Sequence, residues 1–589
     1  MVKSSLAAVI VGVGALGCGA DAGPRYTVAG QIEGIWDGAP VQLRLEHGAD
    51  ADVIALDRDG AFAFTTPLAA GDAYLVTVAN GEPCDVARGM GTVDDDVTDV
   101  TVRCGAPVDV RVDARPDWRF DPVPTASVVG LSVLAQRVRV TVTAPAALAI
   151  DVGGRAVVSG EPVELTLGAT QEVPIAFTGG GRSRTYRLGL HRGELPIEVA
   201  GHVTAEQPPV PGLPVMFGAG LATDGDAVIA GAPWLDGSDT ADSGGVRVLA
   251  AAGGGWTGGA WLTLAPPRSY AEFGAAVAVD GDVLVVGAPI DRGLNDLVTG
   301  RAYVFRRGPL GWSLEAALQA SEPGFDDKFG ATVAVRDGTV LVGAPFEDSA
   351  ALDLDGNAAD DSATDAGAVY EFREVAPGDW RQTAYVKAPV PTQGFGGAVA
   401  LEGDHAIIGA GRSGRAFAFH RTGTTWQPGV ELMPAVRGPS SAFGARVALS
   451  GSRAAVSDVY DSGAGSGVDG DTAQTGPASG GAVHVYRLDG TGWQREAYVK
   501  ATHPESSYFG QGLALLGDVL VVGAPQAAGG RGGLDVYHRG AAGWVADGAV
   551  PITVASDVAN AGTTVALSWR GVAVAAPRDA AGGAVTLLR

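Results

Sequence analysis

An acidic segment near the middle of the chain has the residue types of a calcium-binding loop. Residues 346–367 read FEDSAALDLDGNAADDSATDAG. Five oxygen-bearing side chains cluster around a glycine in this segment: Asp353, Asp355, Asn357, Asp360 and Asp361. Ca²⁺ takes oxygen ligands from alternate positions of such loops. We therefore expect these five residues to bind Ca²⁺ with the weak affinity of extracellular sites. The alternative is a solvated acidic loop.

A second acidic segment, residues 461–481, has only Asp469 and Asp471 beside a glycine, so it is a poorer calcium candidate. Motifs for other chemistry are scarce. The sequence contains no G-x-S-x-G, no H-E-x-x-H and no P-loop, and its eight histidines are scattered. It offers no catalytic constellation, and we predict that the protein is not an enzyme.

The charge of the chain limits its partners. The 589 residues carry a formal net charge of −25. A phosphate backbone repels such a surface, so nucleic acid is excluded as a partner. Cations are the natural counter-charge, although acidic residues also keep an exported protein soluble.

The amino terminus has the pattern of an export signal. Residues 1–17 combine Lys3 with a short apolar run, which ends at Cys18. Within 1–22 the pattern resembles a bacterial lipoprotein signal, which implies a lipid on Cys18, a membrane anchor, and an outer-membrane or cell-surface location. The family usually has Leu where this chain has Ala15. Cleavage after Ala22 would instead give a secreted or periplasmic protein.

Cysteine use fits an exported chain. The two remaining cysteines are Cys84 and Cys104, and an even pair in an exported protein normally forms a disulfide. The spacing does not match a metal site. We therefore predict a Cys84–Cys104 bridge, which closes a loop of about 20 residues and adds about 3 kcal/mol in the chain-entropy view.

Two small β domains are expected before residue 194. Strand-like alternation and Asp-Gly turns run through 25–105 and again through 106–193, and both patterns predict β-sandwiches. The first segment resembles Ig-like modules of bacterial lipoproteins. The second resembles cadherin-like modules of bacterial surface proteins, in its ending RTYRLGLHR. Residues 194–216 contain a Pro-rich stretch and read as a connector with one spare strand.

The rest of the chain repeats one phrase. Phe-Gly begins at residues 217, 273, 329, 395, 443 and 509, and a worn copy begins near Asn560. Each copy is followed by an apolar strand, a two-residue turn, a second strand that often ends in Gly-Ala-Pro, a variable loop, a third strand and a Trp-led fourth strand. Repeats of this length indicate stacked units. Residues 217–589 therefore predict an all-β, seven-bladed propeller, in which Gly287 and its equivalents let strands pack closely.

This grammar resembles FG-GAP repeats, which build the propeller of integrin α subunits. The resemblance implies a module for adhesion or ligand binding. Integrin-type repeats hold Ca²⁺ between their first two strands. Here that loop has shrunk to turns such as Asp280-Gly281 and Asp337-Gly338, which suit a type I′ hairpin and leave no room for a calcium site.

The same resemblance places ligand contacts on the variable loops and on the turns that lead into each Phe-Gly. Tyr270, Phe325 and Tyr508 lie in these turns and are candidate aromatic anchors for a protein or glycan. Packing beneath the loops is the equal alternative for all three. The alternative functions are a propeller enzyme that acts on extracellular polysaccharide or phospholipid, and an envelope scaffold without a ligand.

The last repeat lacks a fourth strand, because the sequence ends at Arg589 directly after its third. An unpaired edge would remain there. We expect residues 195–205, which alternate in part, to pair with 583–588 and to close the ring.

Lipidation makes the first testable prediction. Cys18→Ala removes the thiol that would carry the lipid, so the variant should leave the membrane fraction and appear in the soluble fraction. Cell fractionation with immunoblotting measures this distribution. Unchanged sedimentation of the variant would contradict the lipid anchor.

Overall fold

The computed structural model describes most of the chain from residue 24 to residue 589. The described residues are 24–80, 84–104, 108–113, 118, 120, 126–132, 134, 137–167, 170–179, 181–195, 197, 199–205, 215–225, 227–237, 240–252, 255–292, 297–438, 440–473, 476, 479–502, 507–550, 552, 559–569, 571–579 and 582–589. They form two compact units. One contains residues up to 129 together with 139–165 and 170–190, and the other contains 130–138, 166–169 and 191–589. Cys18 lies outside the described residues.

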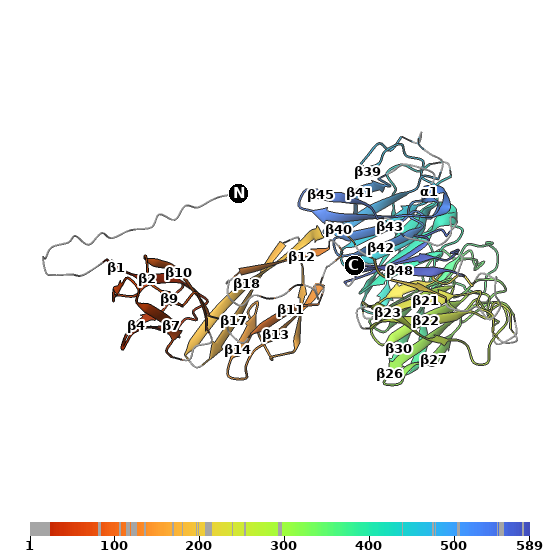
Figure 1. Ribbon diagram of the computed structural model, residues 1–589. Helices are drawn as coiled ribbons and strands as arrows, with labels where there is room; N and C mark the ends of the chain where they lie inside the picture. Colours follow the sequence, from red (N-terminus) through yellow and green to blue (C-terminus); the bar gives the residue numbers. More distant parts are fainter. Residues whose placement is uncertain are drawn as a thin grey trace. The chain divides into compact units, whose positions relative to one another are not determined.

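Nearly all regular structure is β, as the sequence predicts (Figure 1). In the described residues, helix is limited to the short η1 (Gly411–Ser413) and α1 (Ala527–Gly530). Turn-rich composition explains this, because glycine recurs too often for long helices.

Residues 25–104 build two four-stranded sheets around one core. Their strand orders are β5-β2-β10-β8 and β4-β3-β7-β9, with a small β1-β6 pair beside them. Alternate side chains of both sheets point inward, so Val28, Leu43 and Val102 are fully buried in the shared core. The strands are β1 (Arg25–Tyr26), β2 (Val28–Glu33), β3 (Val41–His47), β4 (Asp50–Leu56), β5 (Gly60–Ala63), β6 (Leu68–Ala69), β7 (Ala73–Val78), β8 (Cys84–Ala87), β9 (Met90–Thr92) and β10 (Val97–Cys104).

The predicted disulfide is present. Cys84 and Cys104 lie directly opposite each other on β8 and β10, with their Cα atoms 3.9 Å apart, and their sulfur atoms are bonded. The bridge joins the edge strand of the sheet to its neighbour.

Residues 109–195 build a three-stranded sheet, β11-β13-β16, and a five-stranded sheet, β12-β18-β17-β14-β15. Phe177 and Tyr186 are buried, and their rings meet edge to face at 5.8 Å between centroids. The strands are β11 (Asp109–Val112), β12 (Ala126–Ser132), β13 (Arg137–Thr143), β14 (Ala149–Val152), β15 (Arg155–Val157), β16 (Pro162–Thr166), β17 (Thr170–Gly179) and β18 (Arg182–Leu195).

Residues 199–588 build seven antiparallel sheets within the described part of the chain, which we number one to seven in the order of their first strands. Sheets one to three are β20 (Leu221–Thr223), β21 (Ala227–Ala232), β22 (Gly245–Ala252) and β23 (Gly255–Leu262); β24 (Ala276–Asp280), β25 (Val283–Ala288), β26 (Arg301–Gly308) and β27 (Gly311–Leu318); and β28 (Thr332–Arg336), β29 (Thr339–Ala344), β30 (Ala368–Ala376) and β31 (Asp379–Val386).

Sheet four is β32 (Ala398–Glu402), β33 (His405–Ala410), β34 (Arg415–Thr422), β35 (Thr425–Trp426) and β36 (Val430–Leu432). Sheets five to seven are β37 (Phe443–Ser450), β38 (Arg453–Asp458), β40 (Ala482–Asp489), β41 (Gly492–Lys500) and β39 (Gly467–Val468); β42 (Gly512–Leu516), β43 (Val519–Gly523), β44 (Leu534–Gly540) and β45 (Gly543–Val550); and β46 (Thr564–Ser568), β47 (Gly571–Ala576), β48 (Ala584–Leu588) and β19 (Val199–Thr204).

The first strands of these sheets follow one another in a closed sequence. Each first strand contacts the first strand of the next sheet, from β20 to β46, and β46 contacts β20. Sheet seven takes its outer strand from residues that precede sheet one, because β19 pairs with β48 from Val199 opposite Leu588 to Thr204 opposite Ala584. The prediction that 195–205 pairs with 583–588 is therefore confirmed. The pairing covers the edge that β48 would otherwise expose.

Each Phe-Gly forms the middle of one tight turn. In sheet two the carbonyl of Glu272 accepts the N–H of Ala275 at 3.0 Å, and Gly274 has a φ of 99°. A turn of this kind needs positive φ at its third residue, which glycine adopts without strain. Phe273, the second residue, is fully buried against Tyr303 and Phe305.

The glycine of Gly-Ala-Pro packs against the turn of the following sheet. A Cβ on Gly287 would lie 2.0 Å from the carbonyl oxygen of Gly330, and a Cβ on Gly343 would lie 2.2 Å from that of Gly396. The expected close packing at Gly287 is therefore confirmed. Each side chain larger than hydrogen would push neighbouring sheets apart.

The short turns between first and second strands differ in detail from the prediction. Among the turns whose residues the structure describes, only Asp337-Gly338 has positive φ at both residues, 48° and 69°, as a type I′ turn requires. In sheet two Asp280 instead pairs with Val283, so that Gly281 and Asp282 form the turn. Glycine then occupies the first central position, which favours type II′. The expected type I′ turn at Asp280-Gly281 is therefore wrong by one residue.

The close approach at Gly287 makes a testable prediction. Gly287→Ala should destabilise the protein by about 1–3 kcal/mol, because the added methyl group overlaps a backbone carbonyl that cannot move alone. Thermal melts followed by circular dichroism measure the change. Gly490→Ala is the control, because a Cβ on Gly490 meets no atom within 4 Å. Equal melting temperatures for the two variants would contradict the packing argument.

Candidate functional site

One end of the seven sheets carries all the variable loops. The loop between the second and third strands of each sheet runs beside the turn that enters the next sheet. The N–H of Asp326 bonds the carbonyl of Val298, and the N–H of Tyr508 bonds that of Ser479. Gly300 also forms a bridge with Phe329. We call this end the loop face, and its described residues lie within 233–244, 263–275, 289–300, 319–331, 345–367, 387–397, 411–414, 433–445, 459–481, 501–511, 524–533, 552–563 and 577–583.

Residues with positive φ recur in the turns of this face. The residue before Phe-Gly, or before its worn copy, has positive φ in six of the seven turns. These residues are Met216, Glu272, Lys328, Gly394, Tyr508 and Asn560. For the five residues other than Gly394 this conformation is strained, and strain of this kind persists only where the surrounding structure fixes it and clusters at functional sites. The repeated turn thus holds five different side chains, those of Met216, Glu272, Lys328, Tyr508 and Asn560, in one backbone conformation.

Two of these positions interact through charge. Burial raises the pKa of Glu272, while a hydrogen bond from the Trp234 indole and the charge of Lys328 oppose that rise. Lys328 also pairs with Asp326, with 2.6 Å between Nζ and Oδ1.

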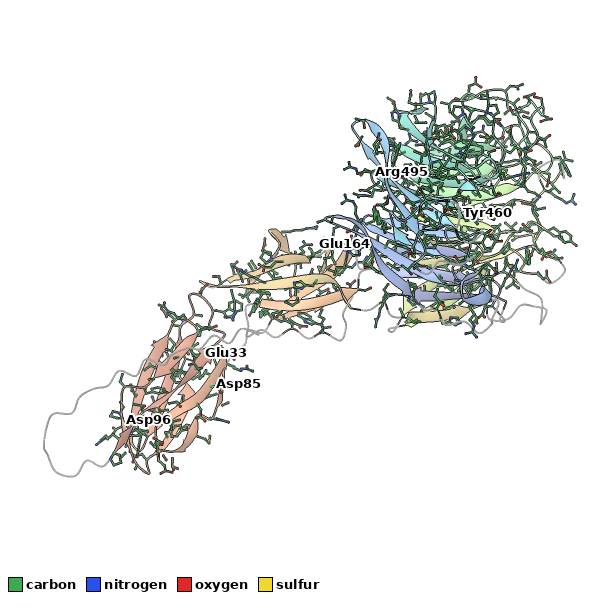
Figure 2. All side chains as sticks on the ribbon, turned by 90° about the horizontal axis from the view of Figure 1, so that it is seen from above. Glu33, Asp85, Asp96, Glu164, Tyr460 and Arg495 are labelled. Carbon is green, nitrogen blue, oxygen red and sulfur yellow. A yellow bond between two sulfur atoms is a disulfide. The ribbon has the colours of Figure 1, made fainter. Side chains whose placement is uncertain are left out.

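The three predicted aromatic anchors lie on the loop face. Tyr270 is 59% exposed and Phe325 is 69% exposed, so neither packs beneath its loop. Tyr508 is half-buried, and its ring meets that of Tyr460 edge to face at 5.9 Å. Tyr460, which the sequence analysis did not single out, is 46% exposed and is labelled in Figure 2.

The acidic loop 346–367 is held from below by a buried ion pair. Lys387 donates to Glu347 Oε2 and to the carbonyl of Ser349, each at 2.7 Å, and Tyr385 donates its hydroxyl to Glu347 Oε1 at 2.6 Å. Lys387 and Glu347 are almost fully buried. Burial lowers the pKa of Lys387, and the charge of Glu347 opposes this shift. Such a pair fixes a geometry more than it adds stability, because desolvation offsets the attraction.

The loop 461–481 repeats this anchor. Lys500 pairs with Asp461 at 3.0 Å, and the Tyr498 hydroxyl donates to the same carboxylate at 2.7 Å. Asp469 makes two hydrogen bonds with the backbone of Tyr498: its carboxylate accepts the N–H of Tyr498, and its own N–H donates to the carbonyl of Tyr498.

Two of the residues predicted to bind calcium instead accept hydrogen bonds from backbone N–H groups. Asp355 has a φ of 54°, and its carboxylate accepts the N–H of Tyr385 at 2.8 Å, just as Asp469 does in the other loop. Asp360 accepts the N–H of Ala350 at 2.8 Å. Within the described residues no group of three or more His, Cys, Asp or Glu side chains has a metal-binding arrangement. Calcium binding by Asp353, Asp355, Asn357, Asp360 and Asp361 stays a prediction.

Like charges gather beneath this loop instead. Asp327 is 4% exposed and accepts the N–H of Gly324 at 2.7 Å. Burial raises the pKa of Asp327 to about 6, and the carboxylates of Glu347, Asp348 and Asp361 add to the rise. A buried carboxyl group that titrates near pH 6 is unusual and marks this part of the face.

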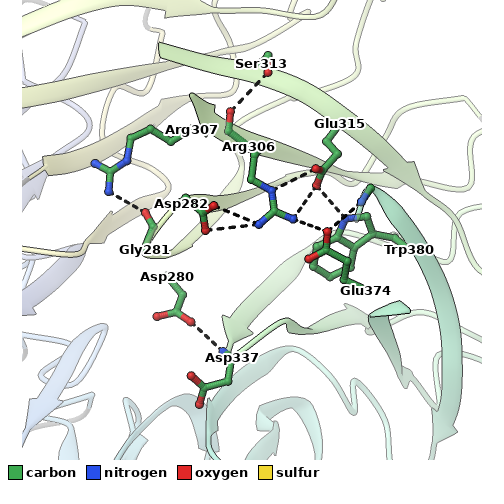
Figure 3. A network of polar contacts seen from close by, with 11 residues as sticks. Asp280, Gly281, Asp282, Arg306, Arg307, Ser313, Glu315, Asp337, Glu374 and Trp380 are labelled. Atoms are coloured by element: carbon green, nitrogen blue, oxygen red, sulfur yellow. Dashed lines mark hydrogen bonds and ion pairs between the residues drawn. The ribbon is translucent and has the colours of Figure 1, made fainter. Parts of the chain in front are cut away.

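The opposite end of the sheets is made of charges that satisfy one another (Figure 3). Arg306 binds Glu315 of its own sheet at 3.0 Å and Glu374 of the next at 2.7 Å, while the Trp380 indole donates to Glu315 at 3.0 Å. Glu496, Arg453, Arg539 and Trp544 repeat this arrangement between sheets five and six. These groups join neighbouring sheets, which leaves the loop face as the better candidate site.

Sequence reasoning located the loops but missed how they are anchored. The signal was available, because Lys387 and Lys500 are two of only four lysines and each ends an identical AYVK stretch. Burial of a lysine depends on a carboxylate some 40 residues away, which no local pattern reveals.

No helix in the described part of the chain is long and apolar enough to cross a membrane. Sequence comparison matches the FG-GAP repeat family at residues 256–305 and 312–372. No curated protein matches the chain. Among solved structures, a proposed 6-phosphogluconolactonase from Bacteroides uniformis ATCC 8492 shares 12% identity, covering 64% of this chain and 92% of that one. Its TM-score is 0.36, which carries no argument about fold or activity.

The raised pKa of Asp327 predicts a pH effect. The folded protein holds this proton more tightly than the unfolded chain, whose Asp pKa is about 4, so folding stability falls as pH rises from about 4 to about 6. Asp327→Asn removes this loss. The variant should therefore be more stable than the parent at pH 7, with a smaller difference at pH 4.

Thermal melts at both pH values measure this prediction, with Asp326→Asn as the matched control because the Asp326 side chain is 51% exposed. A variant less stable than the parent at pH 7 would contradict it.

Proposed function

Since the chain carries FG-GAP repeats within an almost entirely β structure, we propose that residues 199–589 form a seven-bladed β-propeller whose loop face binds a protein or glycan ligand. The seven sheets, the closed sequence of contacts between their first strands and the shared Phe-Gly turn support the propeller. Such folds host many activities, so the function rests on the site.

The single observation that carries the binding role is the set of exposed aromatic side chains on the loop face. Tyr460, Tyr270 and Phe325 keep between 46% and 69% of their surface exposed. Rigid aromatic groups supply contact area at low entropic cost, and they dominate binding energy at protein interfaces. Tyr460 directly follows Val459 at the start of the loop held by Lys500, so the anchor also limits its motion.

The remaining domains fit a surface role. We propose that residues 25–105 and 106–193 are the Ig-like and cadherin-like β-sandwiches of a stalk, in a protein exported and lipid-anchored through Cys18. Secretion without an anchor is the alternative. Calcium binding within 353–361 belongs to this proposal as a secondary feature.

Replacement of the aromatic anchor tests the binding role. The purified full chain is applied to a glycan array and to pull-downs from the medium and envelope in which the protein occurs. Tyr460→Ser should weaken the binding of any saturable ligand at least tenfold, because truncation of a central aromatic anchor commonly costs about 2 kcal/mol or more.

Leu310→Ser is the matched control, because Leu310 is fully exposed but lies in the turn between β26 and β27. Equal loss in both variants, or saturable binding unaffected by Tyr460→Ser, would contradict binding by the loop face. Absence of any ligand for the parent protein would favour a scaffold.

A further inference from the structure

Sheet five keeps Phe443-Gly444 but departs from the repeat at Gly-Ala-Pro and at the residue before Phe-Gly. Ser457, Asp458 and Val459 replace Gly-Ala-Pro. Ala442, which precedes Phe443-Gly444, is the one residue among the seven turn positions that lacks positive φ. Its N–H instead binds the buried carboxylate of Asp458 at 2.8 Å. Departures from an otherwise consistent pattern concentrate at functional sites.

The first strand of this sheet is also irregular. In sheets two and three pairing is continuous from Ala276 and from Thr332, opposite the Gly-Ala-Pro glycine. In sheet five, pairing of β37 with β38 shifts between Phe443 and Val447. The N–H of Arg446, within this interval, binds the Ser457 hydroxyl at 3.0 Å instead. Such irregularities redirect the side chains they contain.

Small residues occupy the position of Arg446 in every other sheet. They are Gly220, Ala276, Thr332, Ala398, Gly512 and Thr564. These positions face the neighbouring sheet: the Thr332 hydroxyl bonds the carbonyl of Gly396 at 2.7 Å, and a Cβ on Gly512 would meet the carbonyl of Gly562 at 2.4 Å. Arg446 is thus the one charged side chain at the inner edge of the ring at this level.

The Arg446 guanidinium is accessible but has no carboxylate partner among the described residues. The residue is exposed, and its Nη1 donates to the carbonyl of Ala445 at 2.9 Å. Burial by surrounding protein lowers the pKa of Arg446, and no nearby anion opposes this effect. The Arg446 side chain thus touches solvent although protein surrounds it. We infer that it projects toward the axis of the ring.

From this arrangement we propose that Arg446 binds the carboxylate of a ligand at the axis of the ring. The planar guanidinium offers paired N–H donors that match a carboxylate, and an unpaired one retains them for a ligand. With a protein charge of −25, long polyanions are repelled, whereas a single acidic group can reach one isolated cation. The ligand class is therefore a small organic acid or the single acidic sugar at the end of a glycan.

Calorimetric titration of the full chain tests this proposal. Sodium glucuronate is the probe and glucose is its neutral counterpart, both at constant ionic strength. Glucuronate should bind the parent protein at least tenfold more tightly than glucose. Arg446→Gln should abolish that preference, and Arg446→Lys should retain part of it, because lysine keeps the charge without the paired donors.

Arg336→Gln is the matched control, because Arg336 also lies on a first strand but pairs with Asp280 and Glu402. It should leave glucuronate binding unchanged. Thermal melts verify that each variant folds. Tighter binding of a glucuronate-terminated oligosaccharide than of free glucuronate, lost in Arg446→Gln, would identify a glycan end, whereas equal affinities would identify a small acid.

Either of two results would overturn the proposal: no preference for glucuronate in the parent protein, or the same preference in Arg446→Gln. The inference rests on the proposed function only in placing a ligand near the loop face. Tyr460→Ser tests that face separately. Glucuronate binding that survives Tyr460→Ser but not Arg446→Gln would support the axial site even if the aromatic anchors fail.

Discussion

The close approach of a glycine in one sheet to the Phe-Gly turn of the next is the contact on which the ring depends. Gly231, Gly287, Gly343, Gly409 and Gly523 each point at a carbonyl oxygen where a Cβ would come within 2.3 Å. The same turn sends its phenylalanine into the core between sheets. One short phrase therefore sets both the separation of neighbouring sheets and the packing that fills it, and chain closure by β19 completes the ring.

Sheet five replaces this contact with a polar one. Ser457 takes the place of the glycine, and its hydroxyl accepts the N–H of Arg446. Buried Asp458 then holds the turn that strained backbone forms elsewhere. With these substitutions the first strand of sheet five still contacts its neighbours, but Arg446 no longer pairs with the second strand. The only long, charged side chain at that level of the inner edge arises where the rule is relaxed, which connects packing directly to the proposed acid-binding site.

Charged side chains are paired differently at the two ends of the ring. At the end opposite the loop face, arginines and glutamates from adjacent sheets form ion pairs, as Arg306 and Glu374 do. At the loop face, the ion pairs are buried beneath the loops, where Lys387 and Lys500 each bind a carboxylate. Buried pairs of this kind add little net stability, but breaking them leaves an uncompensated buried charge, so they favour the observed positions of the two long acidic loops.

Sequence alone determined the all-β class, the disulfide, the repeat and the closing strand, because each follows from alternation, cysteine count or spacing along the chain. It also placed Tyr270 and Phe325 in the turns that lead into Phe-Gly, but the tertiary structure decided that both are exposed. Only the tertiary structure decided the partners of Tyr508, the burial of Lys387 and the isolation of Arg446. Those outcomes depend on contacts between residues distant in sequence, and burial and charge pairing are properties of such contacts, not of local residue patterns.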